Sequence, residues 1–172
     1  MLEAIRNRRS IRKYTGAPVT REQIEGLLRS AMQAPSARNL QPWHFTVITC
    51  RDTLARVPEV HPYASMVPGA GAAILVSGDT SVQPLPGYLA QDCSAAVMNL
   101  LLEAVNTGLG AVWLGVYPRE ERIQGIRELL SLPEHLLPMA LISVGVPGED
   151  KGYQDRYDPS RIRWITSGEA VR

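Results

Sequence analysis

The chain has few of the residues that would commit it to metal or disulfide chemistry: two cysteines and three histidines in 172 residues. Cys50 and Cys93 lie far apart, form no CxxC pair and have apolar neighbours, so neither a disulfide framework nor a zinc site is indicated. We expect two small buried thiols in a reducing cytoplasm. His44, His61 and His135 lack metal-ligand spacing such as HExxH.

Other signatures are missing as well. The sequence has no GxSxG elbow and no P-loop, which leaves little support for a hydrolase. No stretch approaches the ~18 apolar residues that would span a bilayer. The net charge of +1 argues against a nucleic-acid binder, whose affinity comes from neutralising many phosphates. We therefore expect neither a membrane nor a nucleic-acid partner.

What is present is the composition of an ordinary globular domain, with 45% hydrophobic and 20% charged residues. This length favours one domain over residues 1–172. A capping box from Thr20 to Gln23 opens a helix that should end near Ala34, before Pro35. Further helices are predicted over 88–107 and 119–130, with a short one capped at 52–53 that ends before residue 58. Strands are predicted over 44–49, 72–77, 111–116 and 139–146, with a loop at 83–87 and an extended element at 162–165.

The first candidate site is a basic cluster near the start of the chain. Between Arg6 and Lys13, five of eight residues are basic and none is acidic. The arginines in Arg8-Arg9-Ser10-Ile11-Arg12 could bind a phosphate by forked, charge-assisted hydrogen bonds, and the serine hydroxyl adds a neutral donor. Taken alone, such a cluster is more often a solvated basic surface.

The second candidate lies between a predicted helix and a predicted strand, over residues 35–43. Ser36, Asn39 and Gln41 can each donate and accept hydrogen bonds, and an amide matches the alternating carbonyls and nitrogens of a flavin ring. An ordinary proline-containing turn is the alternative.

The third candidate is the glycine-rich stretch over residues 108–115. It follows a helix and opens a strand, the reverse of a Rossmann fingerprint, so a Rossmann NAD site is rejected. Gly115 would still let a backbone N–H approach a flat ligand closely.

Taken together and in order, these segments resemble the FMN-dependent nitroreductase family, within the NADH oxidase and nitroreductase superfamily. The match involves RRSIRKY from Arg8, PSARNLQPWHFTV from Pro35, QDCSAAVMNLLLEAVNTGLGAVWLGVYP from Gln91 and DRYDPSRIRW from Asp155. The resemblance implies an α+β sandwich with a central mixed, largely antiparallel sheet flanked by helices. It also implies an intertwined homodimer with FMN at the subunit interface, in which the tail, about residues 147–172, embraces the partner.

The resemblance assigns the phosphate and ribityl contacts by position. Arg8, Arg9, Ser10 and Arg12 resemble these contacts, and Arg156 matches a late arginine that also reaches the phosphate. Many members have a lysine two residues before that arginine, where this chain has Gln154. Either the phosphate site is one charge weaker, or Lys151 substitutes.

The resemblance likewise assigns contacts to the flavin ring. Asn39 resembles a ring contact, with Ser36 and Gln41 nearby and able to serve the partner's flavin. The backbone at Leu114 and Gly115 resembles the segment that meets flavin N5. No catalytic side chain is expected, because the flavin carries the chemistry.

The implied reaction is a ping-pong hydride transfer from NADH or NADPH, through flavin N5, to a small oxidised acceptor such as a nitroaromatic, a quinone or another flavin. The connections between about 58 and 88 are short for the family, which leaves the acceptor open. The alternatives are another flavin reaction on this scaffold (dehalogenase, dehydrogenase or flavin-destructase) and a low-turnover flavin-binding or redox-sensing module.

The assignment of Arg12 can be tested directly. Arg12→Ala should weaken FMN binding by at least ~1.5 kcal/mol, the lower value for one hydrogen bond to a charged group. An unchanged dissociation constant in an FMN titration would remove Arg12 from the site.

Overall fold

The computed structural model describes residues 1–165, and its centre is one sheet of four antiparallel strands in the order β1-β2-β4-β3. The strands are β1 (Trp43–Ile48), β2 (Ala72–Asp79), β3 (Gly110–Gly115) and β4 (Leu136–Gly145). The α-helices are α1 (Glu3–Asn7), α2 (Arg21–Ala31), α3 (Arg51–Val60), α4 (Pro86–Asn106) and α5 (Glu120–Leu130). Short 3₁₀ turns occur at Ala37–Asn39, Val67–Gly69 and Pro159–Arg161.

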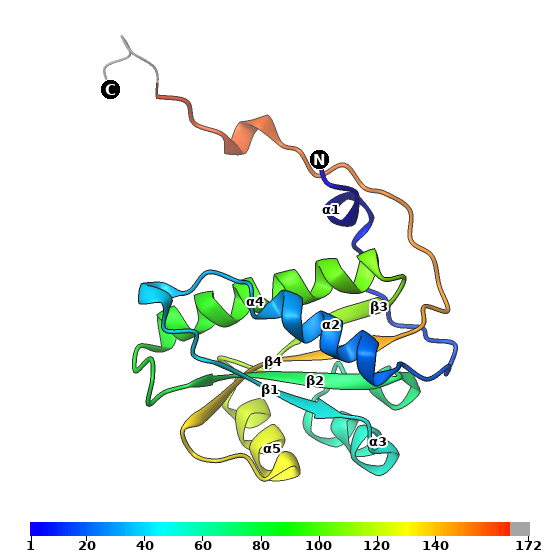
Figure 1. Cartoon of the computed structure of the whole chain (residues 1–172), viewed down its shortest axis with the longest axis vertical. Coiled ribbons are helices and arrows are strands. Elements are labelled where there is room, and N and C mark those ends of the chain that lie inside the picture. Colours follow the sequence, from blue (N-terminus) through cyan, green and yellow to red (C-terminus); the bar gives the residue numbers. More distant parts are fainter. Residues whose placement is uncertain (166–172) are drawn as a thin grey trace.

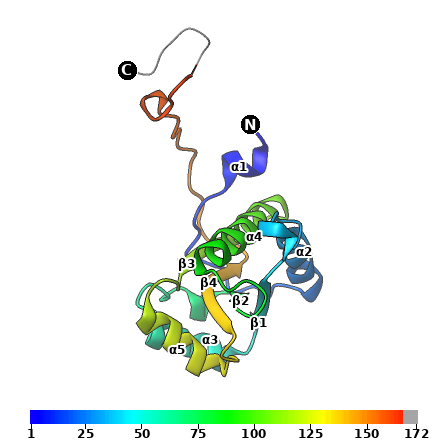
Figure 2. The same ribbon diagram turned by 90° about the vertical axis from the view of Figure 1, so that its left-hand side faces the viewer.

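Helices cover both faces of the sheet (Figures 1 and 2), with α2 and α4 on one face and α3 and α5 on the other. The two central strands are buried along almost their whole length, so alternate side chains enter two separate cores. Ile74 and Ile142 pack in the core under α4, whereas Leu75 and Leu141 pack in the core under α3 and α5. The expected α+β sandwich with a largely antiparallel sheet is confirmed.

Several predicted boundaries were wrong. The helix predicted to end before Pro58 runs to Val60, and its N-cap is Cys50. A proline in the last turn removes only one helical hydrogen bond, and the buried Leu54 and Val57 hold the helix in place. As the N-cap at the end of a strand, Cys50 is exposed, contrary to expectation, while Cys93 is buried as expected.

Proline also explains the earlier start of the longest helix. The predicted loop over 83–87 ends inside α4, because Pro86 occupies the first turn, where a missing N–H costs nothing. At the other end of the chain, residues 162–165 pair with no strand of the described region. None of the described helices has the length and hydropathy of a membrane span.

Residues 10–15 run across the end of the sheet and are held there by backbone contacts. Ser10 forms a parallel bridge with Ala111 of β3, and the Ile11 N–H donates to the Ala111 carbonyl at 3.0 Å. A Cβ on Gly110 would lie 2.7 Å from the Ile11 side chain, so the glycine permits this close approach. The segment that carries the basic cluster is therefore fixed to edge strand β3.

Gly110 gives a test of this packing. Gly110→Ala should lower the free energy of unfolding by about 1–3 kcal/mol, because the new methyl group overlaps Ile11. Gly26→Ala is the matched control: this position lies inside α2 with open space around it, and alanine there should raise the free energy by about 0.5–1 kcal/mol. Urea unfolding measures both, and equal effects would contradict the packing of Ile11 on Gly110.

Candidate functional site

Glu149 fixes the basic segment through hydrogen bonds to its backbone. Its carboxylate accepts hydrogen bonds from the backbone N–H groups of Arg12 (2.6 Å) and Lys13 (3.3 Å). It also pairs with Lys151 at 3.1 Å, and the Lys151 ammonium donates to the Ser10 carbonyl at 2.7 Å. These contacts, above all the hydrogen bond from the Arg12 backbone, lower the pKa of Glu149. The charge of Lys151 is therefore already paired with Glu149.

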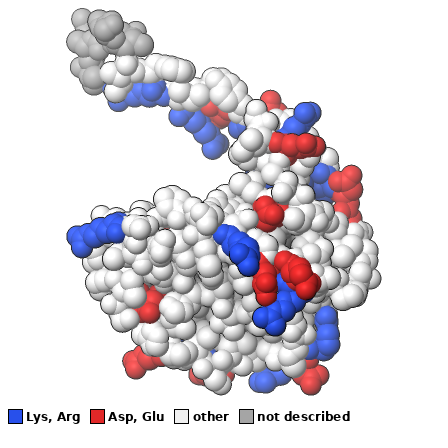
Figure 3. Space-filling view, in the orientation of Figure 1, with Lys and Arg blue, Asp and Glu red and all other residues white. Residues whose placement is uncertain are grey.

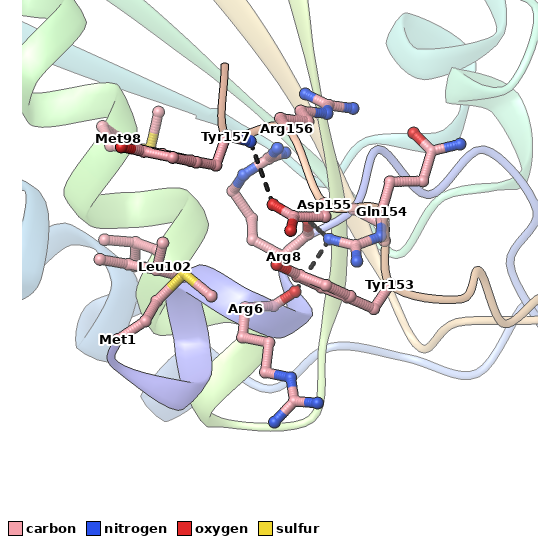
Figure 4. A pocket seen from close by; sticks show the side chains of 12 residues that line it. Met1, Arg6, Arg8, Met98, Leu102, Tyr153, Gln154, Asp155, Arg156 and Tyr157 are labelled. Atoms are coloured by element: carbon pink, nitrogen blue, oxygen red, sulfur yellow. Dashed lines mark hydrogen bonds between the residues drawn. The ribbon is translucent and has the colours of Figure 1, made fainter. Parts of the chain in front are cut away.

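A cleft of about 480 Å³ opens on one side of this segment; we call it the arginine cleft. Figure 4 shows the side chains that line it, which come from the N-terminal segment, from α4 and from the tail. They include Arg8, Arg9, Met98, Leu102, Tyr153 and Arg156. Gln154 lines this cleft and Lys151 does not.

Positive charge dominates the arginine cleft: Arg6, Arg8, Arg9 and Arg156 line it, and Asp155, whose Oδ1 accepts from the Tyr157 N–H at 3.0 Å, is the one acidic residue of the described chain in its lining. Burial, Arg156 and Arg9, in that order, lower the pKa of the Arg8 guanidinium. The ion pairs formed among residues 1–165 involve none of these three arginines. Positive groups that repel one another in a half-buried cleft favour binding of an anion, and the forked donors of arginine suit a phosphate.

Arg9 differs from Arg8 because most of its donors are already used. Its guanidinium donates to the carbonyls of Arg8 (2.6 Å), Gly152 (2.9 Å) and Arg6 (3.0 Å) and lies 5.8 Å from the centre of the Tyr153 ring. Arg9 thus ties the N-terminal segment to the tail, in addition to adding positive charge to the cleft.

A second cleft, of about 440 Å³, lies along the free edge of β3, and we call it the β3-edge cleft. Its lining includes Arg12, Trp113, Leu114, Gly115, residues from the 61–66 connection, and Arg122. The Ala111 carbonyl points to this edge, since it accepts from Ile11. Because backbone groups alternate along a strand, the N–H groups of Trp113 and Gly115 also point there.

Two side chains that the sequence did not single out hold the end of β3. The Gly115 carbonyl accepts from Arg122 Nη1 at 2.8 Å and from His61 Nε2 at 3.0 Å. The other ring nitrogen of His61 accepts from the Tyr63 N–H at 3.3 Å, which assigns the proton to Nε2. Burial lowers the pKa of His61. In sequence, His61 is an isolated histidine and Arg122 is one of several charged residues on a helix. Neither belongs to a motif that would have indicated a functional role.

The second predicted segment, residues 36–41, has an unusual backbone. Arg38, Asn39 and Gln41 have φ values of 56°, 56° and 50°, in a region that non-glycine residues rarely occupy. The buried Asp92 carboxylate accepts from the Ala37 N–H at 2.9 Å and holds the loop on α4. Such strain is concentrated at functional sites.

The structure separates the predicted residues into three groups. Arg8, Arg9 and Arg156 line the arginine cleft, and Arg12, Leu114 and Gly115 line the β3-edge cleft. Neither cleft is lined by the other four residues, Ser10, Ser36, Asn39 and Gln41; Ser10 lies on the segment between Arg9 and Arg12. The roles of all ten remain predictions.

A positively charged cleft and a cleft with free backbone donors, both lined in part by one pinned segment of an α+β sandwich, are the features expected of a protein that holds a phosphorylated cofactor. Comparison with known proteins identifies the family. The model of the Nitroreductase family matches residues 5–65 and 59–146, and the chain belongs to this family.

Two relatives with provisional names show how closely the chain resembles other members. A protein of Methanothermobacter thermautotrophicus named as an NADH dehydrogenase/NAD(P)H nitroreductase is 51% identical over 162 residues, which cover 94% of this chain and 85% of that protein. A crystal structure from Parabacteroides distasonis with the same provisional name is 41% identical, with a TM-score of 0.91 over 95% of this chain and 96% of that one.

A third relative was solved with a cofactor. The structure of a provisionally named nitroreductase from Desulfovibrio desulfuricans, in complex with FMN, is 35% identical, with a TM-score of 0.82 over 95% of both chains.

The contacts of Glu149 predict a pH dependence of stability. Because the folded-state pKa lies below the ordinary value of 4.5, the carboxylate stabilises the fold above that value, and this contribution is lost as pH falls through the folded-state pKa. Glu149→Gln should therefore be less stable than the parent chain near neutral pH, with a difference that shrinks in acid. Urea unfolding across this pH range measures the difference, and a constant gap would contradict the assignment.

Proposed function

We propose that the protein is an FMN-dependent oxidoreductase that transfers hydride from NADH or NADPH to a small oxidised acceptor such as a nitroaromatic, a quinone or another flavin. The observation that carries this proposal is the arginine cleft, in which Arg8, Arg9 and Arg156 gather and none of the three forms an ion pair within the described chain. The FMN complex of the Desulfovibrio desulfuricans relative supports the choice of cofactor.

The residues present fit FMN. The same three arginines of the arginine cleft would hold the phosphate, and Ser10 lies on the segment between Arg9 and Arg12. The ring would lie in the β3-edge cleft, where Gly115 has no neighbour within 4 Å of an added Cβ and so leaves room for a flat ligand. When bound, FMN supplies the hydride-accepting N5 and passes the electrons on to the acceptor.

The protein's own groups orient the cofactor and set its electrostatics. The N–H of Gly115 points into the β3-edge cleft, and the clamp of His61 and Arg122 on the Gly115 carbonyl fixes the direction of that strand end. Arg12 and Arg122 line this cleft and would place two positive charges beside a bound ring, where they would stabilise negative charge on it. No side-chain acid or base is required.

The proposal includes a homodimer. The tail from residue 147 leaves the body and arches over it (Figures 1 and 3), with Tyr157, Trp164 and Ile165 each more than 70% exposed. Met1 and Leu2 are similarly exposed on the neighbouring N-terminal segment. Apolar surface gathered in this way favours burial against a second copy. In the dimer the strained loop at 36–41 would contribute Ser36, Asn39 and Gln41 to the partner's flavin.

A spectroscopic experiment tests the function. The purified protein should be yellow, and NADH or NADPH should bleach the flavin under anaerobic conditions in a stopped-flow instrument. A nitroarene or quinone should then restore the colour. Slow bleaching with both nicotinamides would favour the low-turnover binding module, and bleaching without reoxidation would favour another flavin reaction. A colourless protein that fails to bind added FMN would refute the proposal.

A further inference from the structure

The connection between α3 and β2 forms one wall of the β3-edge cleft. His61, Pro62, Tyr63, Ser65 and Met66 of this connection line the cleft. His61 is almost fully buried and bonded to the Gly115 carbonyl, so the connection is attached directly to the end of β3. A short connection thus reaches the place where the flavin ring would lie.

Tyr63 is exposed but held in place. Its residue surface is 67% exposed, while the Arg122 guanidinium lies 5.2 Å from its ring centre and the His61 ring meets it edge-on. Arg122 is in turn fixed by its bond to the Gly115 carbonyl. An aromatic ring ordered in this way at the wall of a cleft provides a surface on which a planar ligand can stack.

The charge of the cleft is positive. Arg12 and Arg122 line it, no Asp or Glu does, and neither arginine takes part in an ion pair within residues 1–165. A guanidinium has five N–H donors, and Arg122 uses one of them on the Gly115 carbonyl. Donors therefore remain for an anionic group of a ligand.

We propose that Tyr63 and Arg122 form the acceptor subsite, and that this subsite selects planar aromatic acceptors that carry an anionic substituent such as a carboxylate. Tyr63 would stack on the ring of the acceptor and Arg122 would pair with its charge. The inference rests on the proposed function, because the acceptor must lie against a flavin held beside Gly115.

The test compares two ligands that share a nitrobenzene ring and differ in charge: para-nitrobenzoate and para-nitrobenzyl alcohol. Calorimetry measures their binding to the oxidised, FMN-loaded protein without nicotinamide, so that the readout is independent of turnover. The parent protein should bind the benzoate more tightly. Arg122→Gln should weaken benzoate binding about tenfold more than it weakens alcohol binding, the size of one charge-assisted hydrogen bond.

Matched variants separate charge from structure. Arg119→Gln removes the same charge from the exposed N-cap of α5, outside the cleft, and should change neither affinity. Arg122→Lys keeps the charge and should retain the preference for the benzoate. Tyr63→Ala should weaken both ligands, whereas Tyr63→Phe should weaken neither.

Equal losses of both ligands in Arg122→Gln, or no loss of either, would overturn the proposal. If that variant does not retain FMN, the parent protein decides: equal affinity for the two ligands overturns the inference. If NAD(P)H bleaches the flavin normally and any of these contradicting results is found, only the subsite is rejected and the proposed function is retained.

Discussion

The contact on which the site depends is the one between the Glu149 carboxylate and the backbone N–H groups of Arg12 and Lys13. These hydrogen bonds, together with the bridge from Ser10 to Ala111, hold residues 10–13 between β3 and the start of the tail. With the segment held there, Arg8 and Arg9 line the arginine cleft and Arg12 lines the β3-edge cleft. The backbone of residues 8–12 thereby links the arginine cleft to the β3-edge cleft.

Electrostatics then explain why the arginine cleft suits an anionic ligand. Arg8 is half-buried. Burial and the neighbouring Arg156 and Arg9 disfavour the charged form of its guanidinium and so lower its pKa. A phosphate would relieve that repulsion, and any ligand that binds only the folded chain also stabilises the fold. At the β3-edge cleft, a neutral buried His61 and a charged Arg122 hold a single carbonyl, so the position of the strand end is fixed by two independent side chains.

The sequence predicted the elements well where a strong periodic pattern coincided with burial, as in β2 and α4. It placed two helix boundaries wrongly at prolines. Pro86 opens α4, where the missing N–H has no helical partner, whereas Pro58 lies within α3 and removes one hydrogen bond, a loss that the burial of Leu54 and Val57 offsets. The order of motifs led to the family, which the comparisons confirm. The roles of His61, Tyr63, Arg122 and Asp92 could not be foreseen, because each depends on contacts between elements that are distant in sequence.

The central claim is that the arginine cleft binds the phosphate of FMN, and riboflavin, which lacks that phosphate, tests it most directly. Both flavins are titrated into the apoprotein of the parent chain and of Arg156→Gln. Arg156→Gln should weaken FMN binding about tenfold or more, the size of one charge-assisted hydrogen bond, and leave riboflavin binding unchanged. Equal losses for both flavins, or no loss for FMN, would contradict it.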